Sequence, residues 1–269
     1  MIKLIAADMD GTFLRDDLTY DNARFRKIFE KMEENGVKFV AASGNQHSKL
    51  RSHFSFNDHI SIIAENGAHV LAEKEELVAS SIPTSKIAQI LALLKRIPRI
   101  EILLSGKRFA YTDSKNEKVL SLAKRFFVNL KVIENIKQLP KDQFFKITCL
   151  LPSDSKGYMT KVIEKNFGGN ICVKAAGHGT LDILSPDINK ATGLERLGKK
   201  YAIRPSQMIA FGNDWNDEEM LTYAGRSFVP GNADPSIQQL ADKIIPSNNS
   251  DGVLKTLEDY AANNWEYPY

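Results

Sequence analysis

The sequence of 269 residues predicts an α/β protein, in which a core with a parallel sheet is interrupted by an α+β unit with an antiparallel sheet. Near both ends of the chain, short apolar segments that stop at polar turns alternate with amphipathic helical stretches, which is typical of βαβ units. In the middle this alternation is lost, and strands follow one another as they do in antiparallel sheets. The length agrees with roughly two domains of about 150 residues each.

The first third of the chain predicts three parallel strands. Residues 2–7 form an apolar run that stops at an acidic, glycine-containing turn, as a buried parallel strand does at its carboxyl end. A helix is expected over 24–35, because apolar residues recur there at helical spacing and Gly36 can end it. Further strands are expected at 37–42 and 60–64, each of which ends in a polar turn.

The pattern changes near Pro83 and changes back after Pro186. Between these prolines we expect helices at 85–96, 115–128 and 155–167 and strands at 100–104, 108–112, 144–151, 170–175 and 180–184. After them we expect a helix from Lys190, helices at 217–223, 235–241 and 252–262, and strands at 208–211 and 227–229. The predicted domains are therefore a discontinuous core, 1–82 with 183–269, and an inserted unit, 83–182.

Composition places the chain among ordinary globular proteins, with 43% hydrophobic and 26% charged residues. The net charge of +3 gives no reason to expect a nucleic acid or an anionic membrane as a partner. The charge is unevenly distributed, however. Residues 83–182 carry 18 Lys and Arg against 8 Asp and Glu, whereas the rest of the chain carries 18 against 25. A basic inserted unit favours a small anionic ligand.

The cysteines and the N-terminal segment indicate the compartment. Cys149 and Cys172 both lie in apolar runs, so we expect buried thiols rather than a disulfide or a metal site. Asp8 and Asp10 interrupt the N-terminal apolar run too early for a signal peptide, and no stretch approaches the ~20 apolar residues of a membrane span. We expect a cytoplasmic protein without a membrane partner.

Carboxylates, a hydroxyl and an ammonium group are expected at one edge of the predicted sheet. Asp8 and Asp10, Ser43 and the segment 213–217 follow predicted strands, and Lys190 begins a predicted helix. Ligands of open α/β sheets bind beyond the carboxyl ends of the strands. Each residue alone has an ordinary alternative, such as a helix cap or a solvated lysine. Together they suit phosphoryl transfer with a hard divalent cation.

Four motifs carry a resemblance to a known family. Asp8-Met9-Asp10-Gly11-Thr12 resembles the D-x-D-G-T signature of the haloacid dehalogenase (HAD) superfamily phosphatases. Ser43-Gly44-Asn45-Gln46 resembles the second family motif, Lys190 the third and residues 212–217 the fourth. The Cof-type branch, which includes bacterial sugar phosphatases, is indicated by Ala42–Gln46, Glu65–Ala68 and the tail from Gly231 to Gly252. The resemblance implies a Rossmann-like core with an inserted cap of type C2.

The resemblance also implies an activity, which is magnesium-dependent hydrolysis of small phosphate monoesters, above all sugar phosphates, through an aspartyl-phosphate. Asp8 would be the nucleophile. Asp10 would protonate the departing oxygen and then deprotonate the attacking water. The phosphate would be held by residues of the second and third motifs, namely Ser43, Gly44, Asn45 and Lys190. In the inserted unit, His178 and Lys146 are further candidates for substrate contacts, with a solvated loop histidine and an exposed strand lysine as the alternatives.

Magnesium would be bound by the Asp8 carboxylate, the Asp10 carbonyl and the fourth motif. That motif departs from the usual G-D-x-x-N-D, because Asn213 stands at the first acidic position and Asp214 follows it. Either Asn213 coordinates through its amide oxygen, with Asp217 acting through water, or Asp214 is the ligand. A third possibility is that Asp214 only caps the following helix.

Other functions fit the sequence less well. An EF-hand starting at Asp8 fails, because Phe13 and Thr19 stand where the loop needs glycine and glutamate. Dehalogenation needs only the nucleophilic aspartate and leaves Asp10 without a role. A phosphomutase of the phosphomannomutase type and a sugar-phosphate-binding regulator with weakened catalysis are the two alternatives kept. The regulator is suggested by Asn213 alone.

Overall fold

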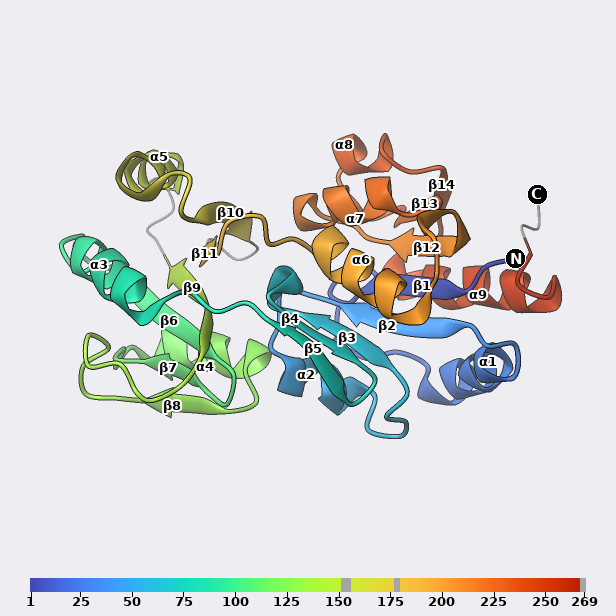
Figure 1. Ribbon diagram of the computed structural model, residues 1–269, viewed down its shortest axis with the longest axis horizontal. Coiled ribbons are helices and arrows are strands. Elements are labelled where there is room, and N and C mark those ends of the chain that lie inside the picture. Colours follow the sequence, from blue (N-terminus) through green and yellow to red (C-terminus); the bar gives the residue numbers. More distant parts are fainter. Residues whose placement is uncertain (151–155, 177–179, 267–269) are drawn as a thin grey trace. The chain divides into compact units, whose positions relative to one another are not determined.

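The computed structural model describes residues 1–150, 156–176 and 180–266, and the chain forms two compact units (Figure 1). Unit 1 comprises Met1–Gly44, Phe54–Leu77 and Asn189–Tyr269, and unit 2 comprises Asn45–His53 and Val78–Ile188. The domain boundaries expected after residues 82 and 182 stay a prediction.

Unit 1 is built on a mostly parallel sheet. Its strands are β1 (Leu4–Asp8), β2 (Lys38–Ala42), β3 (Ser61–Ala64), β4 (His69–Ala72), β5 (Glu75–Ala79), β12 (Met208–Phe211), β13 (Arg226–Pro230) and β14 (Lys243–Ile245). They are ordered β14-β13-β12-β1-β2-β3-β4-β5, and only β3 with β4 is antiparallel among the pairs from β14 to β4. All five residues of the central strand β1 are buried, which explains its continuous apolar sequence.

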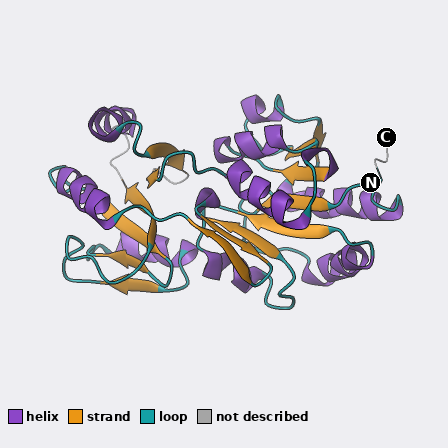
Figure 2. Ribbon diagram, in the orientation of Figure 1, coloured by secondary structure: helices purple, strands orange, loops and turns teal. Residues whose placement is uncertain are grey.

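Helices of unit 1 lie beside this sheet (Figure 2). They are α1 (Asn22–Glu34), α6 (Lys190–Tyr201), α7 (Glu218–Tyr223), α8 (Pro235–Gln238) and α9 (Gly252–Ala262). Helix α1 begins two residues earlier than predicted, because the Asp21 side chain accepts a hydrogen bond from the Arg24 N–H and caps it. Helix α6 begins at Lys190 as predicted, where Asn189 and Thr192 form a capping box. The cap fixes the place at which Lys190 enters the helix.

Unit 2 contains a second sheet of order β10-β11-β9-β6-β7-β8, in which only β7 and β8 pair in parallel. These strands are β6 (Glu101–Gly106), β7 (Ala110–Thr112), β8 (Leu130–Val132), β9 (Phe144–Leu150), β10 (Cys172–Ala176) and β11 (Thr180–Leu184). The helices are α2 (His47–His53), α3 (Thr84–Leu94), α4 (Glu117–Phe126) and α5 (Lys156–Phe167). The apolar side chains of α3 pack with those of the sheet in one buried core. Strand β11 crosses the boundary predicted after residue 182.

The predicted fold class is confirmed, since one sheet is mostly parallel and the other mostly antiparallel. The sequence did not predict β4, β5, β8 or β14. Strands β8 and β14 have three residues each and lie at sheet edges, so they carry too few apolar positions to form a pattern. Cys149 is buried and Cys172 half-buried. Within the described ranges, no helix has both the length and the apolar character that crossing a membrane requires.

Candidate active site

The Lys190 ammonium lies between two carboxylates from distant parts of unit 1. Its Nζ atom is 2.6 Å from Asp8 Oδ1 and 2.6 Å from Asp217 Oδ1. Lys190 and Asp217 are fully buried, and Asp8 is 6% exposed. Asp8 is the last residue of β1, so the strand edge expected from the sequence brings the first, third and fourth motifs together.

Burial and charge shift the pKa values of this group in known directions. Burial and the neighbouring Asp217 carboxylate raise the pKa of Asp8 to about 7, although Lys190 acts in the opposite direction. Burial by itself lowers the pKa of Lys190, but the charges of Asp217 and Asp8 outweigh it and hold that pKa above its usual value. Lys190 therefore keeps its charge, and its ammonium group contacts two carboxyl groups.

Asp217 also shapes the loop of the fourth motif. Its Oδ2 atom accepts hydrogen bonds from the backbone N–H groups of Asn213 at 2.9 Å and Asp214 at 3.1 Å. A side chain at Gly212 would come within 2.4 Å of Asp217, so only glycine fits there. Both Asp217 oxygens are thus engaged by the protein, one by Lys190 and one by the loop.

The Asn213 amide faces the residues that follow β1. Its end lies 3.2 Å from Asp8 Oδ2, 3.2 Å from the Asp10 carbonyl oxygen and 2.9 Å from Thr12 Oγ1. With its nitrogen turned toward these atoms, the amide donates hydrogen bonds to them. With its oxygen turned toward them, three oxygens from Asp8, Asp10 and Asn213 face one another.

These oxygens fit a magnesium ion. Mg²⁺ takes oxygen ligands at about 2.1 Å in octahedral geometry, which places neighbouring ligands about 3 Å apart. The 3.2 Å separations from the Asn213 amide to Asp8 Oδ2 and to the Asp10 carbonyl are close to that spacing. The set contains one carboxylate, one amide and one backbone carbonyl. Among the described residues, no group of three or more His, Cys, Asp or Glu is placed to hold a metal ion.

Asp214 has a different environment. Its Oδ1 atom accepts the Trp215 N–H at 2.7 Å and caps the 3₁₀ turn Trp215–Asp217. Trp215 itself is 52% exposed. The capping alternative weighed for Asp214 therefore accounts for this side chain.

The second motif has its own supporting turn. Ser43 is buried, and its carbonyl accepts the Asn66 N–H at 3.0 Å. The Asn66 side chain accepts a hydrogen bond from Asn216 Nδ2 at 3.1 Å and lies against Gly44, where a Cβ would come within 3.2 Å. Asn66 thus connects the second motif with the fourth.

This turn is strained. Glu65, Asn66 and Gly67 all have positive φ, at 52°, 55° and 104°. A Cβ at Gly67 would lie 2.2 Å from the Asn189 carbonyl oxygen, next to Lys190 in the third motif. Consecutive left-handed residues are costly and cluster at functional sites. The sequence does contain a signal for this turn. Asn66-Gly67 is a turn-forming pair close after β3, at the same sheet edge as the other motifs.

The other predicted site residues are not part of unit 1 as the structure describes it. Asn45 and Lys146 belong to unit 2. Lys146 is buried, with its Nζ atom 3.2 Å from Asp182 Oδ2, and Thr148 Oγ1 donates to Asp182 Oδ1 at 2.7 Å. The alternative of an exposed strand lysine is therefore wrong. His178 lies outside the described residues.

The sequence and the fold both match a known family. A sequence model described as haloacid dehalogenase-like hydrolase matches residues 5–257. The chain belongs to this family. This HAD hydrolase is 35% identical to the 5-amino-6-(5-phospho-D-ribitylamino)uracil phosphatase YbjI of Escherichia coli, over 96% of the chain and 95% of that relative.

Two further comparisons agree. The HAD hydrolase is 27% identical to the HMP-PP phosphatase of Yersinia enterocolitica, over 89% of the chain and 87% of that relative. The crystal structure of SMU.1108c from Streptococcus mutans superimposes on it with a TM-score of 0.92 and 30% identity, over 97% of the chain and 100% of that structure. The predicted family and enzyme class, a HAD-type phosphatase, are confirmed.

The raised pKa of Asp8 predicts how pH acts on stability. A carboxyl group that binds its proton more tightly when folded stabilises the fold in acid, and this gain is lost as pH rises through about 7. In metal-free protein, Asp8→Asn should therefore raise the free energy of unfolding above wild type at pH 8, and this advantage should shrink at pH 5. Urea unfolding in a chelator at the two pH values measures it.

Asp17 provides the matched control. It is exposed, and its pKa lies below the usual value because it accepts hydrogen bonds from Thr19. Asp17→Asn should give no stabilisation at pH 8. An Asp8→Asn effect of the same size at both pH values would contradict the assignment of Asp8 as the group with the raised pKa.

Proposed function

We propose that this HAD phosphatase hydrolyses the phosphate monoesters of small sugars or sugar alcohols, with magnesium, through an aspartyl-phosphate at Asp8. The observation that carries the proposal is the placement of the two Asp8 oxygens. Oδ1 is held by Lys190 at 2.6 Å, and Oδ2 lies 3.2 Å from the Asn213 amide. One carboxylate thus meets a fixed cation on one side and the candidate magnesium ligands on the other.

The chemistry follows from these positions. Asp8 attacks phosphorus, and the Lys190 charge reduces the repulsion between the carboxylate and the phosphate. Asp10, two residues on, donates a proton to the departing alkoxide and later takes one from the water that hydrolyses the intermediate. Ser43, Gly44 and Asn45 are proposed to hold the non-bridging oxygens. A bound Mg²⁺ would add positive charge where negative charge develops on the phosphoryl group.

Asp8, Asp10 and Asn213 are the proposed magnesium ligands. Asp8 would contribute its Oδ2, Asp10 its backbone carbonyl and Asn213 its amide oxygen. Asp217 would act indirectly, because its oxygens already bind Lys190 and the loop N–H groups. Asp214 would not be a ligand, because it caps the 3₁₀ turn.

The substrate class rests on two lines of support. The Escherichia coli relative is named for a substrate whose phosphate is on a ribityl chain, and it aligns over 96% of this chain. The segment Ala42–Gln46 also resembles bacterial sugar phosphatases. We propose that the domain over 83–182 is the cap that selects the substrate, with Lys146 and His178 as contacts.

A phosphate-release assay tests the proposed function. Purified protein with magnesium should release inorganic phosphate from phosphorylated sugars and sugar alcohols, and Asp8→Asn should reduce release to background because the nucleophile is lost. Isomerised phosphosugar without release would instead indicate a phosphomutase. Tight binding without either reaction would indicate a regulator. Either of these last two outcomes would contradict the proposal.

The magnesium ligands are tested at Asn213 and Asp214. Asn213→Asp adds a charged oxygen at the proposed ligand, so the magnesium concentration for half-maximal turnover should fall about tenfold, or about 1.4 kcal/mol. Asp214→Asn should leave it unchanged, because asparagine also caps helical turns. The ligand would be Asp214 instead if the magnesium concentration for half-maximal turnover stayed unchanged in Asn213→Asp or rose in Asp214→Asn.

A further inference from the structure

The loop that follows the two predicted catalytic aspartates folds back on itself. The Phe13 N–H donates to the Asp8 carbonyl at 3.1 Å, and the Leu14 N–H donates to the Met9 carbonyl at 2.8 Å. Gly11 has a φ of +79°, and a Cβ there would come within 2.6 Å of the Asn213 amide. The inner side of the loop is therefore filled by the fourth motif.

Phe13 anchors the same loop in the core. Its ring is 4% exposed and meets the rings of Tyr20, Phe25, Phe39 and Phe54 at centroid distances between 5.0 and 5.7 Å. These contacts fix the loop at residue 13. They do not hold the peptide groups that carry the Gly11 and Leu14 carbonyls.

Two asparagines from the tail hold those peptide groups. Asn232 Nδ2 donates to the Gly11 carbonyl at 2.9 Å, and Asn248 Nδ2 donates to the Leu14 carbonyl at 3.0 Å. The two are themselves connected, because the Asn248 N–H donates to Asn232 Oδ1 at 3.0 Å. We call Asn232 and Asn248 the asparagine bridge.

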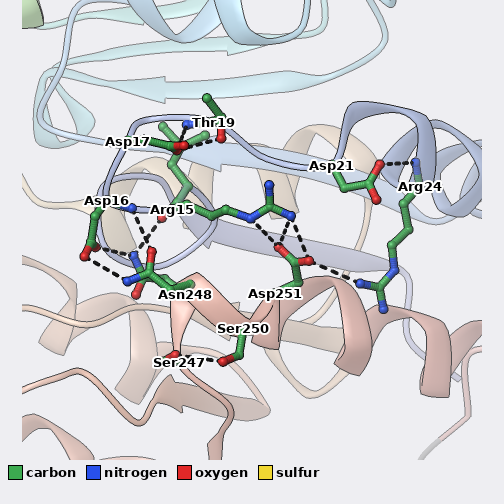
Figure 3. A network of polar contacts seen from close by, with 12 residues as sticks. Arg15, Asp16, Asp17, Thr19, Asp21, Arg24, Ser247, Asn248, Ser250 and Asp251 are labelled. Carbon is green, nitrogen blue, oxygen red and sulfur yellow. Dashed lines mark hydrogen bonds and ion pairs between the residues drawn. The ribbon is translucent and has the colours of Figure 1, made fainter.

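A second set of contacts joins the tail to the residues that follow the loop. Asp16 accepts hydrogen bonds from Asn248 Nδ2 at 2.9 Å and Asn249 Nδ2 at 2.8 Å. Arg15 makes a bidentate pair with Asp251, at 3.0 and 2.9 Å. Figure 3 shows Asp16 beside Asn248, with Arg15 and Arg24 both directed at Asp251. The tail is thus fixed against the segment that follows the loop.

We propose that the asparagine bridge positions Asp10 for proton transfer, an inference that rests on the proposed function. Asp10 directly precedes Gly11, so a shift of the Gly11 peptide changes the direction in which the Asp10 carboxylate points. A displacement of about 1 Å at a catalytic group can cost about 10²-fold in rate. An amide is the side chain that can both donate to Gly11 and accept from Asn248, which is what Asn232 does.

The test compares substrates with different needs for an acid. An alkyl phosphate has a poor leaving group that Asp10 must protonate, whereas the nitrophenolate of p-nitrophenyl phosphate leaves without a proton. We measure kcat/KM for both, because it reports steps up to the formation of the phosphoenzyme and not its hydrolysis. Asn232→Ala should lower kcat/KM about 10- to 100-fold for the alkyl ester and less than about 3-fold for the aryl ester.

Asn249→Ala is the matched control. Asn249 is an exposed asparagine of the same tail, like Asn232, but it binds Asp16 rather than a loop carbonyl. It should change neither value more than about twofold. Melting temperatures should stay close to wild type for both variants. Equal losses of kcat/KM on the two esters in Asn232→Ala would overturn the proposal. A selective loss on the alkyl ester in Asn249→Ala would overturn it as well.

Asp10→Asn separates this inference from the proposed function. Its kcat/KM should fall much further for the alkyl ester than for the aryl ester. If Asp10→Asn shows this selective loss and Asn232→Ala does not, the asparagine bridge has no positioning role, whereas the proposed role of Asp10 stands. If Asp10→Asn shows no selectivity, the proposed acid is wrong and the inference falls with it.

Discussion

The buried ammonium of Lys190 between Asp8 and Asp217 is the interaction on which the site depends. A buried ammonium is stable only when anions pair with it, and a buried carboxylate needs the same compensation. Lys190 supplies it for two carboxylates at 2.6 Å each. The second Asp217 oxygen binds the N–H groups of residues 213 and 214. One charge thus fixes the end of β1, the start of α6 and the loop after β12.

The balance of charge around Lys190 gives a physical reason for an asparagine rather than an aspartate at position 213. Burial and Asp217 already raise the pKa of Asp8 to about 7, so the ionised form of this proposed nucleophile is destabilised before any ligand binds. A carboxylate at position 213, 3.2 Å from Asp8 Oδ2, would add to that repulsion. An amide keeps an oxygen available for a cation without the added charge. Under the proposed function, an asparagine at position 213 should bind magnesium more weakly than an aspartate would, but it should let Asp8 ionise more easily.

Much of the site follows from the sequence, because strand ends and helix starts are local features. Asp8, Lys190 and the fourth motif were placed at one sheet edge by that rule alone. The roles of Asn66, Asn232 and Asn248 were not predicted. Asparagine in a loop has many uses, and Asn232 and Asn248 meet the loop after β1 from more than 200 positions away. No local pattern carries such a contact. The short edge strands β8 and β14 were missed because three residues show no periodicity.

The coupling between Lys190 and Asp217 tests the account most directly. Urea unfolding of Lys190→Met, Asp217→Asn and the double variant, at neutral pH without metal, gives the three free energies. Lys190→Met leaves two buried carboxylates facing each other, and Asp217→Asn removes one of them. If Lys190 and Asp217 are coupled in this way, the free energy of unfolding should fall in the double variant by about 1 to 3 kcal/mol less than the sum of the two single-variant losses. Additive losses, to within about 0.5 kcal/mol, would contradict it.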